Sequence, residues 1–158
     1  MEDIKITKAK ITDKDQLALT FQHFKDKNTM KNRAECYLSH NNAFIAKHGD
    51  QIIGKMLWHV KEDPNYGVAE FEELYVFEEY RRIGIGSKLM KISIQAVRNH
   101  FKKRDFTPRR IFLFVDEKNK DARKLYEKFG FQCVATLGSI FTENEKDLFY
   151  ILDLTKLN

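Results

Sequence analysis

The sequence has few of the residues that cross-link a chain or interrupt its helices and strands. Its 158 residues include two cysteines, two prolines and seven glycines. Two cysteines, Cys36 and Cys133, are too few for a disulfide framework or a zinc cluster, and they fit a reducing compartment. Cys133 falls in a predicted strand, where we expect it in the core. The small share of glycine and proline indicates that most of the chain lies in regular elements.

Long apolar segments are also missing. No stretch of about 18 apolar residues occurs, which argues against a membrane-spanning helix. Residues 1–15 lack the apolar centre of a signal peptide, so we expect a cytoplasmic protein. The length is typical of one domain, and we predict a single domain over residues 1–158.

The net charge of +5 would by itself suggest nucleic-acid binding, but the charge is unevenly distributed. Residues 81–128 contain 15 basic and 5 acidic side chains, whereas residues 62–79 contain seven carboxylates and no lysine or arginine. One segment therefore suits a polyanionic ligand and the other suits a cation. Because the basic excess coincides with the glycine motif described below, we do not expect nucleic acid to be the partner.

The hydrophobic pattern predicts a mixed α/β domain with about seven strands and four helices. Thr12 with Asp15 has the pattern of a helix N-cap, and Leu17, Phe21 and Phe24 follow at helical spacing, so a helix is expected there. The other helices are expected around 30–38, over 84–101 and over 122–129, with Gly130 as the C-cap. The expected strands are 4–6, 43–47, 51–60, 68–77, 110–115, 131–137 and 147–154.

The segment from Val76 to Lys88 carries a candidate phosphate cradle. A predicted strand ends there, Arg81 and Arg82 follow, and Gly84 and Gly86 open a helix. The first N–H groups of a helix have no partner within it, and glycines let these amides approach an anion closely. The spacing excludes a P-loop, and a leucine at position 89 excludes a dinucleotide fingerprint. The alternative is that the two glycines only shape a tight strand–helix turn.

Two motifs in this half of the chain resemble those of one family. The string Arg-Arg-Ile-Gly-Ile-Gly at 81–86 is similar to the Arg/Gln-x-x-Gly-x-Gly/Ala motif of the GNAT superfamily of acetyl-CoA-dependent N-acetyltransferases. About 35 residues later, the segment 119–131 resembles the family's Asn-x-x-Ala-x-x-Leu-Tyr-x-x-x-Gly-Phe pattern. The resemblance covers residues 68–135. It implies a GNAT-like fold of mostly antiparallel strands, with acetyl-CoA bound as co-substrate at a splayed strand pair.

The resemblance also implies a role for each matching position. Main-chain groups of Leu74, Tyr75 and Val76 would pair with pantetheine as an added strand does. Arg81 and the amides from Arg82 to Ser87, which include Gly84, Ile85 and Gly86, would hold the pyrophosphate. Asn119 and Ala122 would contact the cofactor arm, and Tyr126 would protonate the leaving thiolate. Two alternatives stay open: Asn119 caps the helix that follows it, and Tyr126 serves only the core.

A carboxylate is needed to accept the proton of a cationic amine, because an amine with a pKa near 10.4 is almost entirely protonated at pH 7. Glu72 matches the glutamate of spermidine/spermine-acetylating members, and Glu70 matches the general base of histone-acetylating members. We favour Glu72, with Glu70 second. Regular pairing would put both on the face of Leu74 and Val76 with Glu73 on the other face, whereas a bulge would change this. A water chain in place of a fixed base is the alternative.

The leading hypothesis is an N-acetyltransferase that acetylates a primary amine by direct attack in a ternary complex. The acceptor classes that fit the acidic segment are a polyamine, a lysine, a protein N-terminus or another cationic small amine. The five histidines have no metal-ligand spacing, so no metal site is proposed. A catalytically silent acyl-CoA sensor or interaction module of the same fold is the second hypothesis. The resemblance also allows a homodimer, for which the residues reveal no interface.

Overall fold

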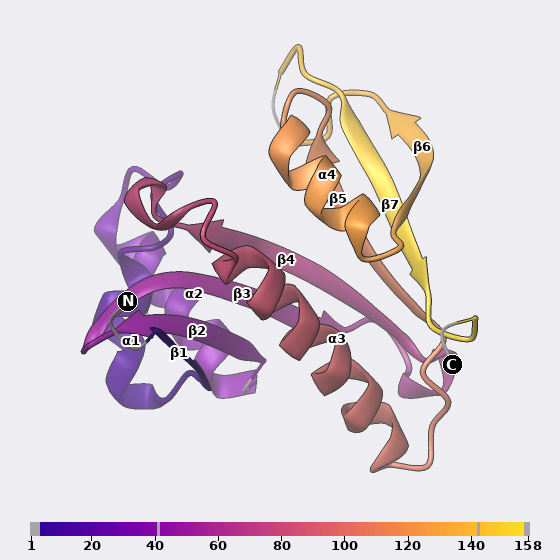
Figure 1. The fold of residues 1–158 in the computed structure, drawn as a ribbon, viewed down its shortest axis with the longest axis horizontal. Coiled ribbons are helices and arrows are strands. Elements are labelled where there is room, and N and C mark those ends of the chain that lie inside the picture. The colour runs from indigo at the N-terminus through magenta and orange to yellow at the C-terminus, as the bar shows by residue number, and fades with distance from the viewer. Residues whose placement is uncertain (1–3, 41, 142, 157–158) are drawn as a thin grey trace. The chain divides into compact units, whose positions relative to one another are not determined.

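The structure, a computed structural model, describes residues 4–40, 42–141 and 143–156. These residues form seven strands in one sheet, with the hydrogen-bonded order β1-β2-β3-β4-β5-β7-β6, and four α-helices (Figure 1). The sheet is mostly antiparallel, with β4 and β5 as its parallel pair. This confirms the predicted mixed α/β fold class. None of the described helices is both long and apolar enough to cross a membrane.

The elements lie close to their predicted positions. The strands are β1 (Ile4–Lys8), β2 (Ala43–His48), β3 (Gln51–Val60), β4 (Val68–Val76), β5 (Arg110–Asp116), β6 (Gln132–Leu137) and β7 (Asp147–Asp153). The α-helices are α1 (Lys14–Ala18), α2 (Lys27–His40), α3 (Ile85–Lys102) and α4 (Lys120–Lys128). Three short 3-10 helices are η1 (Ile11–Asp13), η2 (Pro64–Tyr66) and η3 (Glu78–Tyr80).

The chain divides into two compact units, which we describe one at a time. Residues 1–59 and 73–93 form the N-terminal unit, and residues 60–72 and 94–158 form the C-terminal unit. Each unit has a buried core of its own side chains. The single domain expected over residues 1–158 stays a prediction.

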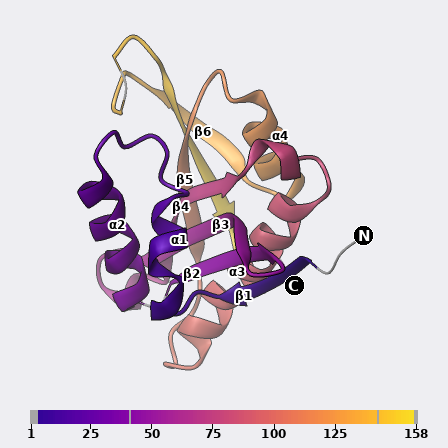
Figure 2. The ribbon, with the colours of Figure 1, turned by 90° about the vertical axis from the view of Figure 1, so that its left-hand side faces the viewer.

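The N-terminal unit is built on the antiparallel strands β1, β2 and β3, beside which Figure 2 shows α1 and α2. The β2–β3 turn has Gly49 at φ 57°, a conformation that glycine adopts without a Cβ clash. Leu17 and Phe21, from the region of α1, pack with Tyr37 of α2 and with apolar side chains of β2 and β3. Burial of this apolar surface is the main force that holds the short helices on the sheet.

The first helix is much shorter than expected. The prediction of a helix capped by Thr12 and continuing to Phe24 was wrong, because α1 ends at Ala18. Asp13 stands at its N-cap without a cap bond. Its carboxylate instead accepts the Lys10 N–H at 2.8 Å and lies 2.6 Å from the Lys47 ammonium. After Ala18 the backbone bonds span three residues rather than four, and this tighter turn ends the helix while Phe21 stays buried.

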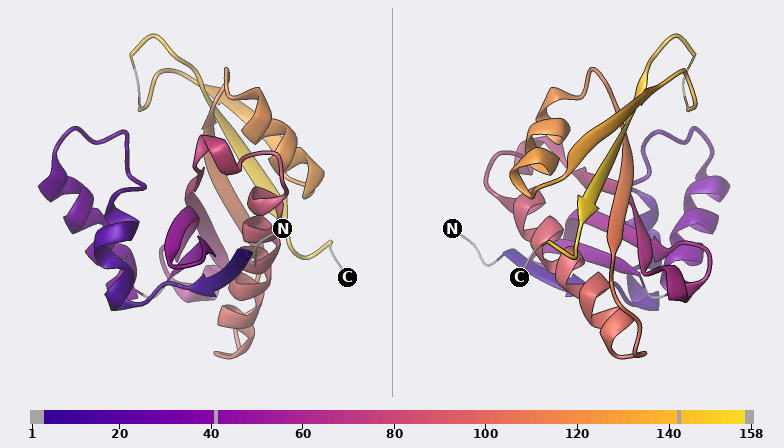
Figure 3. Two further views of the ribbon diagram at one scale, coloured as in Figure 1. Left: turned by 60° about the vertical axis from the view of Figure 1, so that its left-hand side comes forward. Right: turned by 90° about the vertical axis from the view of Figure 1, so that its right-hand side faces the viewer.

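The C-terminal unit places β5, β7 and β6 side by side in antiparallel pairs, with α4 against one face (Figures 1 and 3). On that face Leu113 and Tyr150 are direct partners in the β5–β7 register, and both are buried. The helix ends one residue earlier than predicted: Phe129 is the C-cap, and Gly130, at φ 87°, follows it directly. The expectation that Cys133 is a core residue was wrong: β6 ends the strand order, and Cys133 is exposed on it.

Candidate functional site

The turn between β4 and α3 has the backbone that an anion cradle requires. Arg82 has φ 62° and Gly84 has φ 89°, so two left-handed residues within three positions reverse the chain before α3 begins at Ile85. The Gly84 carbonyl accepts the Lys88 N–H at 3.0 Å, the first bond of the helix. The N–H groups of the first turn therefore point out of the helix, where the dipole favours an anion. No atom lies within 4 Å of the position that a Cβ on Gly84 would take, so this side of the turn is open.

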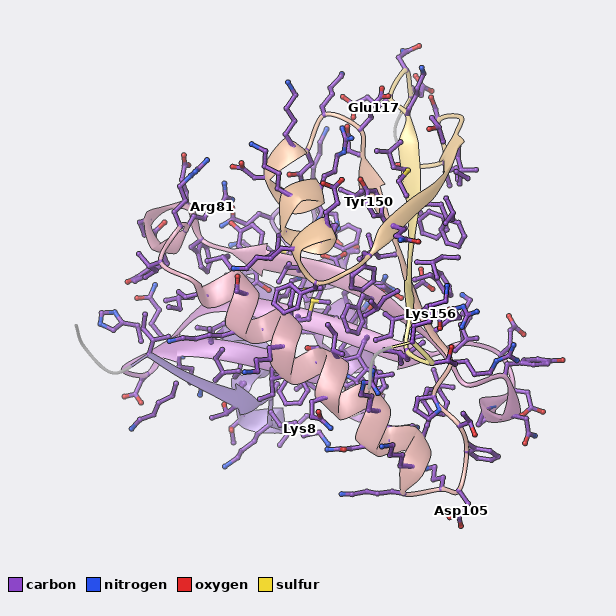
Figure 4. The ribbon with its side chains drawn as sticks, turned by 45° about the vertical axis from the view of Figure 1, so that its right-hand side comes forward. Lys8, Arg81, Asp105, Glu117, Tyr150 and Lys156 are labelled. Carbon is purple, nitrogen blue, oxygen red and sulfur yellow. The ribbon has the colours of Figure 1, made fainter. Side chains whose placement is uncertain are left out.

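Arg81 fixes the turn to the end of β4. Its Nε donates to the Val76 carbonyl at 2.9 Å, and Figure 4 labels its exposed side chain at the turn that leads into α3. The guanidinium has five N–H donors, so this bond leaves others that can reach an anion. The structure thus brings together, within the N-terminal unit, all the predicted pyrophosphate residues: Arg81, Arg82, Gly84, Ile85, Gly86 and Ser87.

The end of β4, from Leu74 to Val76, lies so close to Gly54 of β3 that a side chain at position 54 would clash with it. A Cβ on Gly54 would come within 2.9 Å of the Tyr75 carbonyl oxygen and 3.2 Å of Val76 Cγ2. The Tyr75 hydroxyl donates to Gln22 at 3.0 Å, which points this side chain toward the segment that follows α1. Glycine at position 54 therefore sets the position of the strand to which we assigned pantetheine.

Glu73 interrupts the extended backbone of β4. Its φ of 52° lies in the left-handed region, where a glutamate is strained, and its carboxylate meets two basic side chains within the N-terminal unit. One oxygen lies 3.3 Å from Lys55 Nζ and the other lies 3.4 Å from His23 Nε2. The alternation of side chains between the two faces of the strand is broken at residue 73. The predicted placement of Glu72 on the same face as Leu74 and Val76 therefore no longer follows from regular alternation.

Lys55 is the partner of Glu73 that the sequence analysis missed. Its side chain is 0% exposed, and its ammonium lies 3.0 Å from the centroid of the Phe21 ring. Burial lowers the pKa of Lys55 to about 7, although the Glu73 carboxylate acts in the opposite direction. The sequence held one sign of this arrangement, since Lys55 interrupts the otherwise apolar segment from Ile52 to Trp58.

In the C-terminal unit, the two candidate bases differ in their surroundings. Glu70 lies 3.2 Å from Lys61 Nζ, and its side chain is 14% exposed. Glu72 is half-buried two residues further along the strand. The Glu70 carboxylate is thus already engaged by a neighbouring cation.

The candidate cofactor residues of the C-terminal unit lie at the start and in the middle of α4. Asn119 caps this helix, because its side-chain oxygen accepts the Ala122 N–H at 3.2 Å. Tyr126 is 8% exposed, and its ring lies 6.0 Å from that of Phe131 and 6.3 Å from that of Tyr150, which Figure 4 labels. Burial raises the pKa of Tyr126 to about 12, so its hydroxyl keeps its proton at neutral pH.

Comparison with known proteins identifies the family. The model of the acetyltransferase (GNAT) family matches residues 11–131. The chain belongs to the GNAT acetyltransferase family. Both motifs on which the resemblance rested lie inside the matched residues. The GNAT match also begins well before them and takes in α1, α2, β2 and β3 of the N-terminal unit.

Individual relatives are more distant. The chain is 25% identical over 114 residues to an N-alpha-acetyltransferase of Sulfurisphaera tokodaii, covering 65% of this chain and 63% of the relative. It is 34% identical over 71 residues to a spermine/spermidine N(1)-acetyltransferase of Bacillus subtilis, covering 45% and 43%. Both matches span less than two thirds of the relative's length.

A solved structure shows the same fold. An acetyltransferase from Salmonella typhimurium, solved with its cofactor acetyl-CoA, superposes with a TM-score of 0.77. The superposition covers 96% of this chain and 94% of the other, at 16% sequence identity. At this level of identity the similarity establishes the GNAT fold alone.

Proposed function

We propose that this GNAT protein is an acetyl-CoA-dependent N-acetyltransferase that acetylates a primary amine by direct attack in a ternary complex. The observation that carries the proposal is the turn before α3, with Arg82 and Gly84 in left-handed conformations and an open helix N-terminus. Such a turn suits the phosphates of a coenzyme, and the chain belongs to a family named for acetyl transfer.

The coenzyme contacts divide among three elements. Main-chain groups of Leu74, Tyr75 and Val76 pair with the pantetheine arm, and the amides from Arg82 to Ser87 bind the pyrophosphate. Asn119 and Ala122 contribute from the start of α4, where the Asn119 amide nitrogen remains available as a donor because the cap uses its oxygen.

The acceptor amine loses a proton to a carboxylate before it attacks. At pH 7 this deprotonation costs about 4.6 kcal/mol for an amine with a pKa near 10.4. Glu72 is our first choice of base, directly or through water, because it matches the glutamate of spermidine/spermine-acetylating members, and Glu70 is the second. The amine nitrogen then forms the C–N bond, the C–S bond breaks, and the electron pair leaves on sulfur.

Tyr126 stabilises the leaving thiolate. A thiol has a pKa near 8.5, whereas burial raises the pKa of Tyr126 to about 12. Full proton transfer from this hydroxyl to the thiolate would therefore be uphill. We assign Tyr126 the part of a hydrogen-bond donor to sulfur, and the proton itself comes from solvent or from the protonated base.

The acceptor is a cationic amine. One relative is named for spermine and spermidine and another for N-alpha acetylation, and both descriptions denote primary amines. A polyamine, a lysine side chain, a protein N-terminus and another small cationic amine are the candidates. The carboxylates of residues 62–79 supply the complementary charge.

Two measurements test the proposal. Calorimetry with acetyl-CoA measures coenzyme binding, and thiol release in the presence of polyamines, lysine peptides, N-terminal peptides and aminoglycosides measures transfer. Binding with turnover of at least one amine is the expected result. Binding without turnover would favour a silent acyl-CoA sensor, and the absence of both would refute the enzyme.

A further inference from the structure

We call the face of β5 and β7 that lies opposite α4 their outer face, and in the C-terminal unit it carries aromatic side chains. The register pairs Phe112 with Ile151 and Phe114 with Phe149, and all four side chains are half-buried. On the opposite face Leu113 and Tyr150 are buried, and Tyr150 packs against Tyr126 of α4. The β5–β7 pair is therefore apolar on both faces, although α4 packs on only one of them.

The rings of this outer face form a continuous surface, which we call the aromatic floor and define as Phe112, Phe114, Phe141 and Phe149. Phe114 stacks on Phe149 with centroids 5.1 Å apart, and Phe112 meets Phe149 edge-on at 5.5 Å. Phe141, from the loop between β6 and β7, lies 5.6 Å from Phe114. Phe141 is 66% exposed, so the floor is accessible at this end.

The loop that supplies Phe141 is held in place by a buried carboxylate. Asp147 accepts the backbone N–H groups of Ile140 and Phe141 at 2.9 and 3.3 Å. Asp147 is buried, and it lies at the end of the floor next to Phe141. These bonds hold the exposed Phe141 ring beside the other three rings of the floor.

A carboxylate lies beside the other end of the floor. In the parallel β4–β5 register Glu70 is the direct partner of Phe112, so the two side chains stand on the same face of neighbouring strands. Lys61 engages Glu70 through a half-exposed ammonium, and such partly exposed ion pairs are worth only about 1 kcal/mol or less. An incoming ammonium group can therefore compete for this carboxylate.

We propose that the aromatic floor and Glu70 form the acceptor subsite, and that they select a primary amine carried on an apolar body. The ammonium group lies at the Glu70 end, and the apolar body packs on Phe112, Phe114 and Phe149. Phe141 covers it from the loop. This inference rests on the proposed N-acetyltransferase function and narrows its acceptor from any cationic amine to a single cation next to an apolar group.

The choice against a polyamine follows from the carboxylates at the far end. Asp116 and Asp147 are register partners there, but Asp116 accepts the Lys118 N–H at 2.7 Å and Asp147 holds the loop. A second ammonium group on the floor would lose hydration over the rings, and it would reach these two carboxylates only in competition with the backbone N–H groups that they already accept. An apolar body loses nothing and gains burial.

The experiment measures binding, so that it does not depend on turnover. Calorimetry on the full chain with saturating CoA compares 2-phenylethylamine, a peptide beginning with Phe, ethanolamine and spermidine. We expect the two apolar amines to bind on the order of tenfold more tightly than the two polar ones. The peptide and the small amine distinguish a protein N-terminus from a free metabolite as the source of the same chemistry.

Variants locate the effect. Phe114→Ala and the exposed Phe141→Ala should weaken binding of 2-phenylethylamine on the order of tenfold and leave CoA binding unchanged. Phe106→Ala, a half-buried ring outside the floor in the same unit, is the matched control and should change neither. Because Phe141 is exposed, its variant should fold even if Phe114→Ala does not.

The outcomes separate the two proposals. Tighter binding of spermidine, or apolar-amine binding that Phe141→Ala leaves intact, would overturn the acceptor subsite. If the protein nevertheless transferred acetyl groups after either of these results, the proposed N-acetyltransferase function would still hold. Conversely, the protein could bind apolar amines selectively through Phe141 and yet transfer no acetyl group. This result would support the subsite and contradict the proposed N-acetyltransferase function.

Discussion

The ammonium nitrogen of Lys55 lies 3.3 Å from the carboxylate of Glu73, and this pair ties the middle of β3 to the irregular residue of β4. A buried lysine is costly because its charge is removed from water, and here one carboxylate and the face of the Phe21 ring offset only part of that cost. Arg33 adds a repulsive charge. The lowered pKa of Lys55 should make the stability of the protein depend on pH.

Replacing Lys55 with methionine should stabilise the protein at neutral pH. The pKa of Lys55 is about 7 in the folded chain and 10.5 in the unfolded chain, so the unfolded state binds the extra proton between these values. The free energy of unfolding therefore rises with pH across this window, by roughly 2 kcal/mol from pH 7 to pH 9 for this one group, which is still half protonated in the folded chain at pH 7. Below pH 7 the cost is fully present, on the order of 5 kcal/mol.

Urea unfolding of the wild type and of Lys55→Met at pH 7 and pH 9 tests this linkage. The variant should be more stable at pH 7, and its advantage should shrink as the pH rises. Lys61→Met, at a half-exposed lysine that is also paired with a glutamate, is the control for the loss of a lysine–glutamate pair as such. An advantage of Lys55→Met that is equal at both pH values would mean that Lys55 is not titrating in this range.

The sequence predicted the elements well but could not predict the Lys55–Glu73 pair. Apolar periodicity locates the strands, and Gly84 and Gly130 mark the ends of helices because only glycine adopts φ near 90° at low cost. The left-handed Glu73 has no such signature. It persists because Lys55 and His23 hold its carboxylate, and these partners come from segments 18 and 50 residues earlier in the chain.

The short α1 and the exposed Cys133 illustrate the same limit. Helical spacing of Leu17, Phe21 and Phe24 is compatible with a helix, but burial of Phe21 is achieved after the helix has ended. A strand pattern around Cys133 is compatible with the core, but only the strand order reveals that β6 is an edge. In the first case the local pattern correctly marked Phe21 as a buried side chain but not the end of the helix. In the second case it correctly marked a strand but not the position of that strand at the sheet edge.

Replacing Gly54 with alanine should weaken acetyl-CoA binding through β4. The new Cβ would lie 2.9 Å from the Tyr75 carbonyl oxygen, so β4 must shift at the residues assigned to pantetheine. We expect a loss of stability of about 1–3 kcal/mol and weaker binding of both acetyl-CoA and S-acetylpantetheine. Calorimetry and thermal unfolding measure the two effects.

Gly49→Ala is the matched control for this substitution. Gly49 has φ 57°, and nothing lies within 4 Å of its added Cβ, so the variant should lose some stability and keep its affinity for the coenzyme. Equal coenzyme affinity in Gly54→Ala and the wild type would remove residues 74–76 from the proposed pantetheine contact.

Replacing Gly84 with alanine should act on the phosphates alone. A residue with a Cβ at φ 89° costs about 1–2 kcal/mol, and relief of that strain turns the first amides of α3 away from the anion. Affinity for CoA should fall about tenfold, while affinity for S-acetylpantetheine, which lacks the pyrophosphate, should not change. Gly138→Ala, with nothing within 4 Å of its Cβ, is the control. An equal loss for both ligands would place the effect outside the phosphate cradle.

Replacing Tyr126 with phenylalanine should slow acetyl transfer while leaving coenzyme binding and folding nearly unchanged, because the ring that packs against Phe131 and Tyr150 is retained. If the hydroxyl donates a hydrogen bond to the thiolate, turnover should fall by roughly tenfold to a hundredfold. The raised pKa of about 12 keeps the hydroxyl protonated through pH 10, so the ratio of wild-type to variant rates should stay constant from pH 6 to pH 10. Single-turnover rates across this range provide the measurement, with the exposed Tyr66→Phe as the control.

Two results would contradict this role of Tyr126. A ratio of rates that falls toward one above pH 9 would mean that the hydroxyl ionises far more easily than its burial implies. An unchanged rate at every pH would leave Tyr126 with a packing role only.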